Sequence, residues 1–565
     1  MTRATLASFL DEFVAAAPEA TAAIDLIGTS TVTSTRARLQ ERVRVLEAEL
    51  AQVGLEHGQC VAVFLPNWSD TLVWQFAASA LGAHVIGINT RYNVGEVEHV
   101  LRSARPAVVA VADNFHGLDL FGMLGQALSA TDGDIDPPTV AVVPPPGDVS
   151  AFEPCFDSAA FDLGSGSWHA GSGDTHAAAA PRTPATATAT AAGALGAPDD
   201  PLAVAFTTSG STGTPKLAAH RESAVVRHAR ADAAGMGIVP GDMTLCVLPL
   251  SGVFGFNTAM ATLAGGGAVL MVPVFDPVAT LRAMETERVS HVVGGDDLYG
   301  RLHDTWRDVR GDLSSLKWLG IADFLGRSHE IARWARDEFD ALTTGVFGSS
   351  EVFSLMLFWN ADDAESVRWN GGGRPVSPEI SVRIADPYDD SVMPDGEQGE
   401  LQVRGPNVVD AYLGNPEAAA QAFTADGWFR SGDLAIATGD GGFTYVCRAG
   451  DALRLRGFLV DPAEIETRLA AHADVQTAKV VGITGPGGYA QAVGFVVPSE
   501  DAAVTAADLR QWCANSLAAF KVPSAVHLIA KMPTTVGGNG TKIRAVELRE
   551  WAQQWTDRER DFRSE

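Results

Sequence analysis

The chain has 565 residues, too many for one compact domain, and 46% of them are hydrophobic, enough to form large cores. Its formal net charge of −28 argues against nucleic acid or an anionic membrane surface as the main partner. No apolar run reaches the length of a membrane span, no signal peptide is recognisable, and five scattered cysteines suit a reducing compartment, so we expect a cytoplasmic protein.

Strand-like and helix-like segments alternate over the first 112 residues. Helices are expected throughout residues 1–55, where 36–53 has apolar side chains at helical spacing. The expected strands that follow are 59–65, 82–89 and 107–112. The helices expected between them are 70–81 and 94–103. Apolar strands that alternate with helices predict a parallel sheet covered on both faces.

A stretch of biased composition interrupts this alternation. Residues 177–197 consist almost wholly of Ala, Thr, Pro and Gly, which cannot build a packed core. We interpret the region from about residue 165 to 200 as a linker or a surface insertion, and no function is assigned to it.

One loop holds the chain's densest group of phosphate-binding residue types. It follows an apolar run at 202–206 and precedes a helix-like stretch that begins near Glu222. Glycines turn backbone N–H groups toward an anion, hydroxyls add donors and a lysine adds charge, although a flexible turn has a similar composition. The spacing is not that of a Walker A loop, because its glycines lie too close together. The predicted phosphate-binding residues are Thr207, Thr208, Ser209, Gly210, Ser211, Thr212, Gly213 and Lys216.

The alternation resumes after this loop. The expected strands are 243–248, 268–272, 289–293 and 318–321, and the expected helices are 276–287 and 328–339. Residues 380–448 change character to short alternating strands with Gly-containing turns, which predicts an antiparallel sub-domain. A smaller α+β unit of about 115 residues, an ordinary domain size, is expected from about residue 451.

Five further motifs follow the loop in a fixed order, at 347–351, 399–416, 431–434, 448–466 and 540–543. Together they make the sequence, over about residues 20–550, resemble the adenylate-forming enzymes, which include acyl-CoA synthetases, adenylation domains and luciferases. The resemblance implies an α/β fold with a large N-terminal domain, residues 1–448, of doubly wound sheets. The antiparallel sub-domain at about 380–448 would be β-barrel-like, and residues 449–565 would form a small mobile α+β domain.

The resemblance also implies a reaction in which ATP, with Mg²⁺, activates a small-molecule carboxylic acid and coenzyme A then accepts the acyl group. Two anions must meet in the first step, so the site has to position them and neutralise charge. Lys542 would bridge the carboxylate and the α-phosphate, Glu351 would hold Mg²⁺, and Ser350 would contact the α-phosphate. The other implied nucleotide-binding residues are Phe347, Gly348, Ser349, Asp433 and Arg448.

In the second step that the resemblance implies, the C-terminal domain swings about a hinge at Gly450. A glycine loop then closes over the acyl-adenylate, and pantetheine enters beside Gly457, where the missing side chain leaves room. The implied coenzyme A-binding residues are Arg456, Gly457 and Phe458. The family usually has Asp or Lys at the hinge, and glycine adapts to both backbone states.

The implied acyl pocket has small residues and aromatic walls, which suits a bulky apolar or ring-containing acid. Amino-acid-activating relatives have an Asp near Val253 and Phe254 that pairs with the substrate amine, and no Asp stands there in this chain. The pocket includes a turn expected at 294–297. The implied lining residues are Ser251, Gly252, Phe254, Phe256, Gly294, Gly295, Ile321, Thr344, Gly345 and Val346.

Departures from the family pattern keep three alternatives open. The turn beside adenine is usually small, but residues 320–324 are bulkier and acidic here; Phe347 replaces Tyr and Ser350 replaces Thr. One alternative is an enzyme that forms only the thioester, using acyl-adenylate from a separate adenylating enzyme. Another is a loader of a carrier-protein thiol, and the third is a non-catalytic paralogue that binds nucleotide or acyl groups. The sequence leaves the oligomeric state open, a homodimer included.

Overall fold

The computed structural model describes residues 4–113, 115–147, 160–162, 167–169, 200–208, 215–324, 326–449, 453–455, 458–460, 462–484, 490–500, 502–517, 521–537 and 540–564. They form two compact units. The first consists of Met1–Asp323, Arg327–Val382 and Val403–Phe429, and the second of Phe324–Gly326, Arg383–Gln402 and Arg430–Glu565. Among the described helices, none combines the length and apolarity needed to cross a bilayer.

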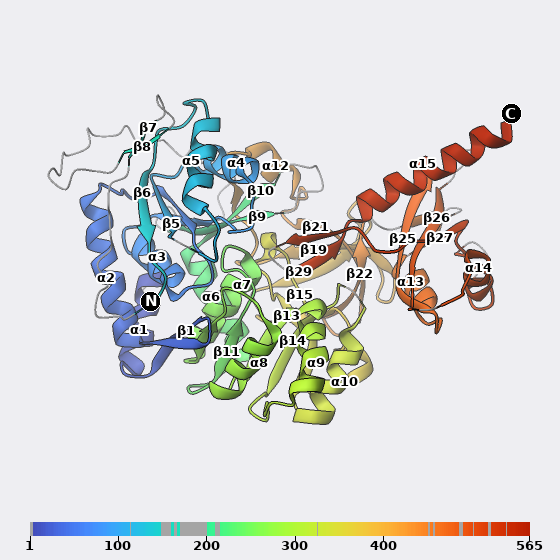
Figure 1. The fold of residues 1–565 in the computed structure, drawn as a ribbon, viewed down its shortest axis with the longest axis horizontal. Helices are drawn as coiled ribbons and strands as arrows, with labels where there is room; N and C mark the ends of the chain where they lie inside the picture. The colour runs from blue at the N-terminus through green and yellow to red at the C-terminus, as the bar shows by residue number, and fades with distance from the viewer. Residues whose placement is uncertain are drawn as a thin grey trace. The chain divides into compact units, whose positions relative to one another are not determined.

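The first unit contains a seven-stranded sheet with the order β20-β10-β9-β4-β3-β5-β6 (Figure 1). The five strands from β9 to β6 pair in parallel, and β10 and β20 add an antiparallel edge next to β9. The strand bounds are β3 (Cys60–Phe64), β4 (His84–Gly87), β5 (Val108–Ala112), β6 (Thr139–Val143), β9 (Leu202–Thr208), β10 (Lys216–Arg221) and β20 (Ala411–Tyr412).

A second sheet of this unit has the strand order β17-β16-β15-β14-β13-β11-β12-β1-β2. The strands from β15 to β1 pair in parallel, whereas β2 pairs antiparallel with β1, and β16 pairs antiparallel with β15 and β17. The bounds are β1 (Thr21–Ile27), β2 (Ser30–Thr35), β11 (Met243–Cys246), β12 (Ala268–Met271), β13 (His291–Gly295), β14 (Trp318–Ala322), β15 (Leu342–Phe347), β16 (Leu357–Phe358) and β17 (Gly372–Pro375).

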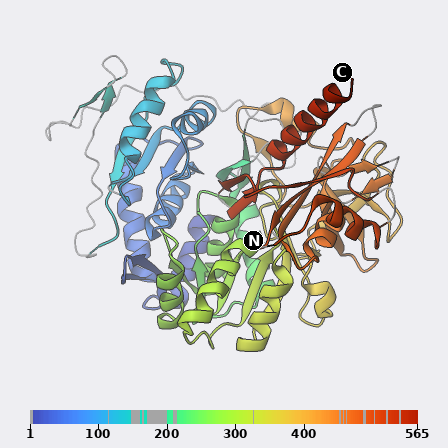
Figure 2. The same ribbon diagram turned by 45° about the vertical axis from the view of Figure 1, so that its right-hand side comes forward.

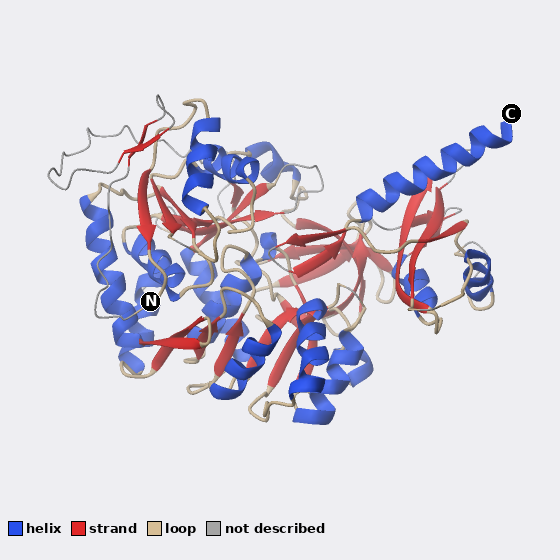
Figure 3. Cartoon of the chain, in the orientation of Figure 1, coloured by secondary structure: helices blue, strands red, loops and turns tan. Residues whose placement is uncertain are grey.

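Helices cover both sheets, as Figure 3 shows in blue against the red strands. Helices α8, α9 and α10 cover one face of the second sheet, in the yellow-green part of Figure 2. Alternate residues of β12 belong to different cores: Leu270 packs with these three helices, whereas Val269 and Met271 pack with α6 and α7. A strand that is buried on both faces has apolar residues at every position. The sequence of β12 could therefore be recognised as a strand. The helices are α1 (Leu6–Ala16), α2 (Arg36–Gln52), α3 (Ser69–Ala80), α4 (Val94–Ala104), α5 (Leu120–Ala130), α6 (Glu222–Met236), α7 (Val253–Ala264), α8 (Pro277–Thr286), α9 (Asp296–Val309), α10 (Ser328–Phe339), α11 (Glu365–Arg368) and α12 (Pro416–Gln421).

Local capping sets where several helices begin. Asn93 accepts a hydrogen bond from the backbone N–H of Glu96, whose side chain accepts one from the N–H of Asn93, and this capping box starts α4. Asp276 caps α8 by a single bond, accepting from the backbone N–H of Ala279, and proline stands at the first helical position. Such caps satisfy N–H groups that have no partner inside the helix, so they fix the helix start.

The second unit consists mainly of antiparallel strands and three helices. Its larger sheet has the order β18-β19-β21-β22, so the strands expected to form the barrel-like sub-domain lie side by side, and a three-stranded sheet has the order β25-β26-β27. The strands are β18 (Ser381–Ala385), β19 (Gln398–Arg404), β21 (Phe429–Ala437), β22 (Phe443–Arg448), β23 (Leu453–Leu455), β24 (Phe458–Val460), β25 (Val475–Thr484), β26 (Ala490–Pro498), β27 (Ala525–Leu528), β28 (Thr534–Gly537) and β29 (Gly540–Ile543). The helices are α13 (Pro462–Ala470), α14 (Ala506–Ala514) and α15 (Ala545–Ser564).

The mixed α/β fold predicted from sequence is confirmed, with two corrections of detail. The prediction that residues 1–55 are helical throughout is wrong, because β1 and β2 lie between α1 and α2. The Ala-rich segment of β1 gains its strand partner from β12, far along the chain, and this tertiary pairing overrides the local preference. The predicted turn at 294–297 is instead the end of β13 followed directly by α9.

The predicted insertion at about 165–200 includes β8 (Ser167–His169), which pairs with β7 (Ala160–Asp162), and otherwise lies outside the described residues apart from Asp200. The predicted boundary after residue 448 stays a prediction. Contacts group residues 383–402 and 430–448 with the C-terminal part of the chain.

A buried carboxylate on β1 makes the stability of the first unit depend on pH. Asp25 is fully buried; its Oδ1 accepts a hydrogen bond of 2.7 Å from the N–H of Ser69, and its Oδ2 has no partner among the described residues. Burial, opposed in part by the Ser69 hydrogen bond, raises the pKa of Asp25 to about 7. The nearby Asp70 raises this pKa as well, and Arg42, which forms a 2.5 Å ion pair with Asp70, lowers it.

We therefore expect Asp25→Asn to flatten the pH dependence of stability. Because the folded-state pKa of Asp25 lies above its unfolded value, the folded chain binds more protons between pH 4 and 7, and Asp25 costs stability as pH rises through this window. Urea transitions at pH 5 and pH 7.5 should show the wild type losing a few kcal/mol, to order of magnitude, relative to the variant. Equal losses in both proteins would contradict this assignment.

Candidate active site

The ends of β9 and β10 hold the two sides of the predicted phosphate loop. Thr208 pairs with Lys216 across the antiparallel ladder, so the two strand ends lie side by side. The Tyr92 hydroxyl lies 2.5 Å from Thr207 Oγ1, and burial raises the pKa of Tyr92, so the phenol stays protonated. The predicted ligands between the strands lie outside the described residues: Ser209, Gly210, Ser211, Thr212 and Gly213.

A second side chain near α4 also anchors this loop. His99 Nε2 donates a 2.7 Å hydrogen bond to the backbone carbonyl of Pro215, immediately before Lys216. Neither Tyr92 nor His99 was predicted from the sequence. Their positions could have indicated a role, because they follow the carboxyl end of β4, and β4 is the parallel neighbour of β9. Residues after the carboxyl ends of neighbouring parallel strands meet at one edge of a sheet, where α/β proteins bind ligands.

Tyr412 connects two residues that were predicted separately. The Nζ of Lys216 lies 4.9 Å from the centre of the Tyr412 ring, within the range of a cation–π contact. The hydroxyl of the same tyrosine donates a 3.3 Å hydrogen bond to Glu351 Oε1. The predicted phosphate-binding lysine and the predicted Mg²⁺ ligand therefore flank a single aromatic side chain. The motif at 399–416 contains Tyr412, but no role for this tyrosine was predicted from the sequence.

The turn that carries Ser350 and Glu351 folds back sharply after β15. Phe347 ends this strand, Ser349 precedes the 3-10 turn η2 (Ser350–Val352), and both are half-buried. Gly348 stands where the chain folds back: a Cβ there would lie 2.6 Å from the backbone nitrogen of Leu355. A side chain at this position would therefore force the turn open.

The segment after β19 holds the backbone of this turn. The N–H of Val409 donates to the Glu351 carbonyl at 2.6 Å, and Asn407 Nδ2 donates to the Val352 carbonyl at 2.9 Å. Asn407 is 1% exposed, so its hydrogen bond is shielded from water. The two carbonyls thus have fixed partners, and the Glu351 side chain is a half-buried carboxylate that accepts the hydrogen bond from Tyr412.

In the second unit, Asp433 and Arg448 form a cross-strand ion pair. They are register partners on β21 and β22, and Arg448 Nε lies 3.0 Å from Asp433 Oδ1. Asp433 is 5% exposed and Arg448 is 53% exposed, so a buried acceptor stands beside an accessible cation. Ser431 supports both residues: its Oγ accepts from the Asp433 N–H at 3.0 Å, and its carbonyl accepts from Arg448 Nη1 at 3.1 Å.

The remaining predicted residues of this unit are only partly described. Lys542 lies on β29, opposite Thr535 of β28, and Phe458 begins β24, opposite Leu455. Only the backbone of Lys542 and Phe458 is described. The predicted hinge and coenzyme A-binding residues Gly450, Arg456 and Gly457 lie outside the described residues.

The predicted acyl-pocket residues fall into several parts of the first unit. Ser251 and Gly252 are half-buried at the start of α7. Phe254 and Val346 belong to one apolar cluster, whereas Phe256 packs against Phe206 with ring centres 5.5 Å apart, in another cluster. Ile321 belongs to the core under α8, α9 and α10.

The backbone positions of the predicted pocket are tightly enclosed. A Cβ on Gly345 would lie 2.0 Å from the Asn370 carbonyl oxygen, and one on Gly294 would lie 2.7 Å from the Leu298 side chain. Gly295, at the end of β13, is buried as well, and Thr344 Oγ1 accepts a 3.2 Å hydrogen bond from the Trp359 N–H. The acyl-pocket assignment of these residues stays a prediction.

Each unit, considered by itself, has groups that can bind part of a nucleotide, and those of the first unit have the chemistry of a polyphosphate site. Lys216 supplies a cation, Glu351 a carboxylate that faces it across Tyr412, and the half-buried Ser350 a hydroxyl. One carboxylate with a neighbouring hydroxyl fits Mg²⁺, which keeps water or phosphate oxygens as most of its ligands. The Asp433 carboxylate can accept hydrogen bonds from a diol, and Arg448 can pair with a phosphate.

Two known protein families match most of the chain. A family described as AMP-binding enzyme matches residues 10–413, and one described as AMP-binding enzyme C-terminal domain matches residues 464–539. The first match includes Lys216, Glu351 and Tyr412, and the second begins after Arg448.

Individual relatives also align over most of their length. A Rhodococcus jostii CoA ligase, named for a propanoyl group on a methyl-dioxo-octahydroindene ring system, is 30% identical over 510 residues, covering 89% of this chain and 92% of the relative. Feruloyl-CoA synthase from Amycolatopsis is 28% identical, with 91% and 93% covered. The crystal structure of ATP-bound MatB from Rhodopseudomonas palustris superposes with a TM-score of 0.78 at 23% identity, covering 98% of this chain and all of MatB.

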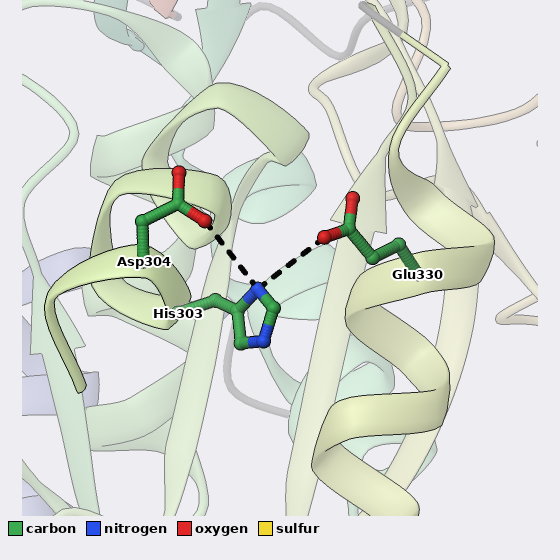
Figure 4. Close-up of side chains that lie close together, drawn as sticks. All are labelled: His303, Asp304 and Glu330. Atoms are coloured by element: carbon green, nitrogen blue, oxygen red, sulfur yellow. Dashed lines mark ion pairs between the residues drawn. The ribbon is translucent and has the colours of Figure 1, made fainter. Parts of the chain in front are cut away.

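One other cluster in the first unit has metal-ligand residue types. His303 and Asp304 on α9 and Glu330 on α10 point toward one another in Figure 4, with His303 Nδ1 3.5 Å from Glu330 Oε1 and 3.6 Å from Asp304 Oδ1. Arg327 already lies against both carboxylates, 3.1 Å from Asp304 and 2.9 Å from Glu330. These carboxylates raise the pKa of Arg327, so its charge is permanent. The cluster is an ion-pair network in which the Arg327 guanidinium supplies the positive charge that a metal ion would otherwise bring to the two carboxylates.

We therefore expect divalent metals to bind no more tightly to the wild type than to His303→Gln. Melting temperatures measured with and without Zn²⁺ or Mn²⁺ should change equally in the two proteins, because bound ligand raises the melting temperature only where a site exists. Arg327→Gln is the contrasting variant: it removes the cation between two carboxylates and should lower the melting temperature in the absence of metal. A metal-dependent rise confined to the wild type would contradict the ion-pair assignment.

Proposed function

The chain belongs to the AMP-binding enzymes, the adenylate-forming ligases, and on that premise we propose that it joins a hydrophobic, ring-containing carboxylic acid to coenzyme A through an acyl-adenylate. The chain is an AMP-forming acid–thiol ligase by family. The observation that carries the proposal is the arrangement of Lys216 and Glu351 on either side of Tyr412, with Glu351 on a backbone turn whose carbonyls are fixed.

The first half-reaction brings the substrate carboxylate to the α-phosphorus of ATP. A carboxylate oxygen forms a bond to phosphorus, the bond from phosphorus to the bridging oxygen breaks, and pyrophosphate leaves. Lys216 binds the phosphate oxygens, and the Ser350 hydroxyl donates a hydrogen bond to the α-phosphate. Glu351 would hold Mg²⁺, which when bound offsets phosphate charge. Lys542 neutralises charge where the two anions meet. Asp433 accepts hydrogen bonds from the ribose hydroxyls, and Arg448 faces the ribose or phosphate.

The second half-reaction transfers the acyl group to a thiol. The coenzyme A sulfur attacks the acyl carbonyl, the bond from this carbon to the AMP oxygen breaks, and AMP leaves. We propose that residues 449–565 rotate about Gly450 between the two steps, removing Lys542 and bringing Gly457 beside the incoming thiol. Glycine at both positions favours this proposal, since one needs two backbone states and the other needs space.

The nature of the acid follows from the predicted pocket and from the names of the relatives. In the predicted pocket, Phe254 and Val346 supply apolar surface without a buried charge. Val253 and Phe254 have no carboxylate that could pair with the amine of an amino acid. The Rhodococcus relative is named for a fused-ring acyl group and the Amycolatopsis relative for a feruloyl group. An acid with a ring system fits these features better than a short polar or amino acid.

A thioester-only activity is the second candidate, favoured by the segment after β14. A family member usually has a small-residue turn beside adenine, whereas here Asp323 accepts a 2.9 Å hydrogen bond from Ser328 Oγ at the start of α10 and Phe324 is 37% exposed. In this candidate another enzyme supplies the acyl-adenylate. A carrier-protein thiol in place of coenzyme A is the corresponding alternative for the acceptor.

We expect Lys542→Ala to separate the two half-reactions. Pyrophosphate release with ATP and a ring-containing acid should fall by about 10²- to 10³-fold, because a charge that acts on the developing transition state is lost. Coenzyme A consumption from synthetic acyl-adenylate should change little, and Lys531→Ala serves as a surface-lysine control. If both rates survive in Lys542→Ala, the role of this lysine is wrong. A wild type that consumes acyl-adenylate but releases no pyrophosphate is a thioester-only enzyme.

Tyr412 provides a second test. Tyr412→Phe removes the hydrogen bond to Glu351 and keeps the ring under Lys216, so the KM for Mg–ATP should rise about fivefold, about 1 kcal/mol, with a smaller change in kcat. Tyr412→Ala also removes the ring and should have a larger effect. If the two variants have equal effects, the hydroxyl accounts for the whole contribution; if Tyr412→Phe matches the wild type, its hydrogen bond to Glu351 has no role in binding.

A further inference from the structure

Three consecutive residues after the Glu351 turn have left-handed backbone angles. Phe353, Ser354 and Leu355 have φ values of 60°, 55° and 39°, and none of them is glycine. Each such residue costs roughly 1 kcal/mol, and the conformation persists only where the surroundings impose it. The run begins two residues after Glu351, so whatever imposes it also sets where the Glu351 carboxylate and the Ser350 hydroxyl lie.

Two buried histidines contact this segment on its backbone. His220 Nε2 lies 2.8 Å from the Ser350 carbonyl, and His228 Nε2 lies 2.9 Å from the Ser354 carbonyl. A carbonyl only accepts, so each Nε2 carries the proton and donates. The side chains are 0% and 3% exposed, and burial lowers the pKa of each to about 4, so both imidazoles are neutral at physiological pH.

The same two rings enclose the first left-handed residue. The ring of Phe353 lies 4.8 Å from the His220 ring and 5.6 Å from the His228 ring, edge to face in both cases. Phe206 and Phe256 complete the enclosure at 6.0 and 6.3 Å. Phe353 is 1% exposed, so the turn cannot relax without moving a fully packed ring.

His220 also places the turn relative to the phosphate loop. It lies on β10 four residues after Lys216, and residues two apart in a strand share a face. On this face Lys216 contacts Tyr412, whose hydroxyl binds Glu351, and His220 binds the carbonyl of the preceding residue, Ser350. One strand therefore fixes the predicted phosphate-binding lysine and the backbone of the predicted Mg²⁺ ligand together.

The cost of burying His220 argues against a role in packing alone. Its Nδ1 is buried and has no hydrogen-bond partner among the described residues. Burial of an unpaired polar atom costs on the order of 1–3 kcal/mol, whereas an apolar side chain of similar size would fill the same space without that cost. The hydrogen bond from His220 Nε2 to the Ser350 carbonyl explains why a polar residue occupies this position.

We propose that His220 and His228 are positioning residues that hold the 350–355 turn in its left-handed form and thereby place Glu351 and Ser350 for Mg²⁺-dependent nucleotide binding. This deepens the proposed function and rests on it. A second acceptor faces the same nitrogen of His228 at a longer distance: Asp232 Oδ2 lies 3.3 Å from His228 Nε2 and accepts a 2.5 Å hydrogen bond from Asn257 Nδ2. The two histidines act through the turn and touch no substrate.

The test uses the full-length chain and a non-hydrolysable nucleotide, α,β-methylene-ATP, titrated calorimetrically with Mg²⁺ and again with EDTA. His220→Met and His228→Met keep apolar volume and remove the donor. We expect their affinity with Mg²⁺ to fall about tenfold, equal to about 1.4 kcal/mol, and their affinity in EDTA to change little. His220→Gln and His228→Gln can still donate from Nε2 and should recover most of the affinity.

His291→Met is the matched control. His291 is 1% exposed and lies 3.1 Å from the Met236 carbonyl through Nε2, the same type of contact elsewhere in this unit, so nucleotide binding should remain as in the wild type. Wild-type affinity in the two methionine variants would overturn the inference. So would an equal loss with Mg²⁺ and with EDTA, or the same loss in His291→Met. A wild type that binds no nucleotide under either condition overturns the proposed function itself, and the inference with it.

Discussion

A backbone carbonyl shielded from water needs a donor, and the turn after β15 depends on that requirement throughout. The carbonyls of residues 350, 351, 352 and 354 all receive hydrogen bonds from outside the turn. The donors are His220, His228, Asn407 and the N–H of Val409. They come from β10, α6 and the segment before β20, so the shape of the turn is set by three elements distant in sequence. A conformation that is locally unfavourable is thereby made the stable one.

Strand β10 connects this turn to the predicted phosphate-binding lysine. Its antiparallel pairing with β9 brings Lys216 to the mouth of the phosphate loop, and its pairing with β20 places Tyr412 next to that lysine. Tyr412 then reaches Glu351. Lys216 is therefore positioned by one edge of the seven-stranded sheet, and Tyr412 of the same edge contacts the carboxylate of Glu351. Preorganisation of this kind lowers the cost of binding a polyphosphate.

The sequence predicted those parts of the fold whose pattern is local. The runs that became β5 and β12 are apolar throughout because these strands are buried on both faces, and such runs can be recognised without a structure. Strand β1 was missed because its Ala-rich sequence has no strand pattern of its own and its partner, β12, lies more than 200 residues away. The expected turn at 294–297 failed because its two glycines suggested a loop, whereas they end a strand that enters a helix directly.

In the candidate site, too, the residues in local motifs were predicted and those brought in by distant contacts were not. Lys216, Glu351 and the Asp433–Arg448 pair were predicted from motifs, since each lies in a short segment with a recognisable spacing. His220 and His228 could not be predicted, because each binds a backbone carbonyl, 130 and 126 residues further along the chain, and a carbonyl leaves no mark in the sequence. Tyr92 and His99 were missed because only the parallel neighbours β4 and β9 bring them to the loop.

The late position of residues 407–409 in the chain has a consequence for how the protein is made. A ribosome adds roughly 5–20 residues per second, so the donors from Asn407 and Val409 are synthesised several seconds after the turn they complete. The two middle carbonyls of the turn therefore receive their donors only from a part of the chain that is made later, and a chain that ended before residue 407 would lack both.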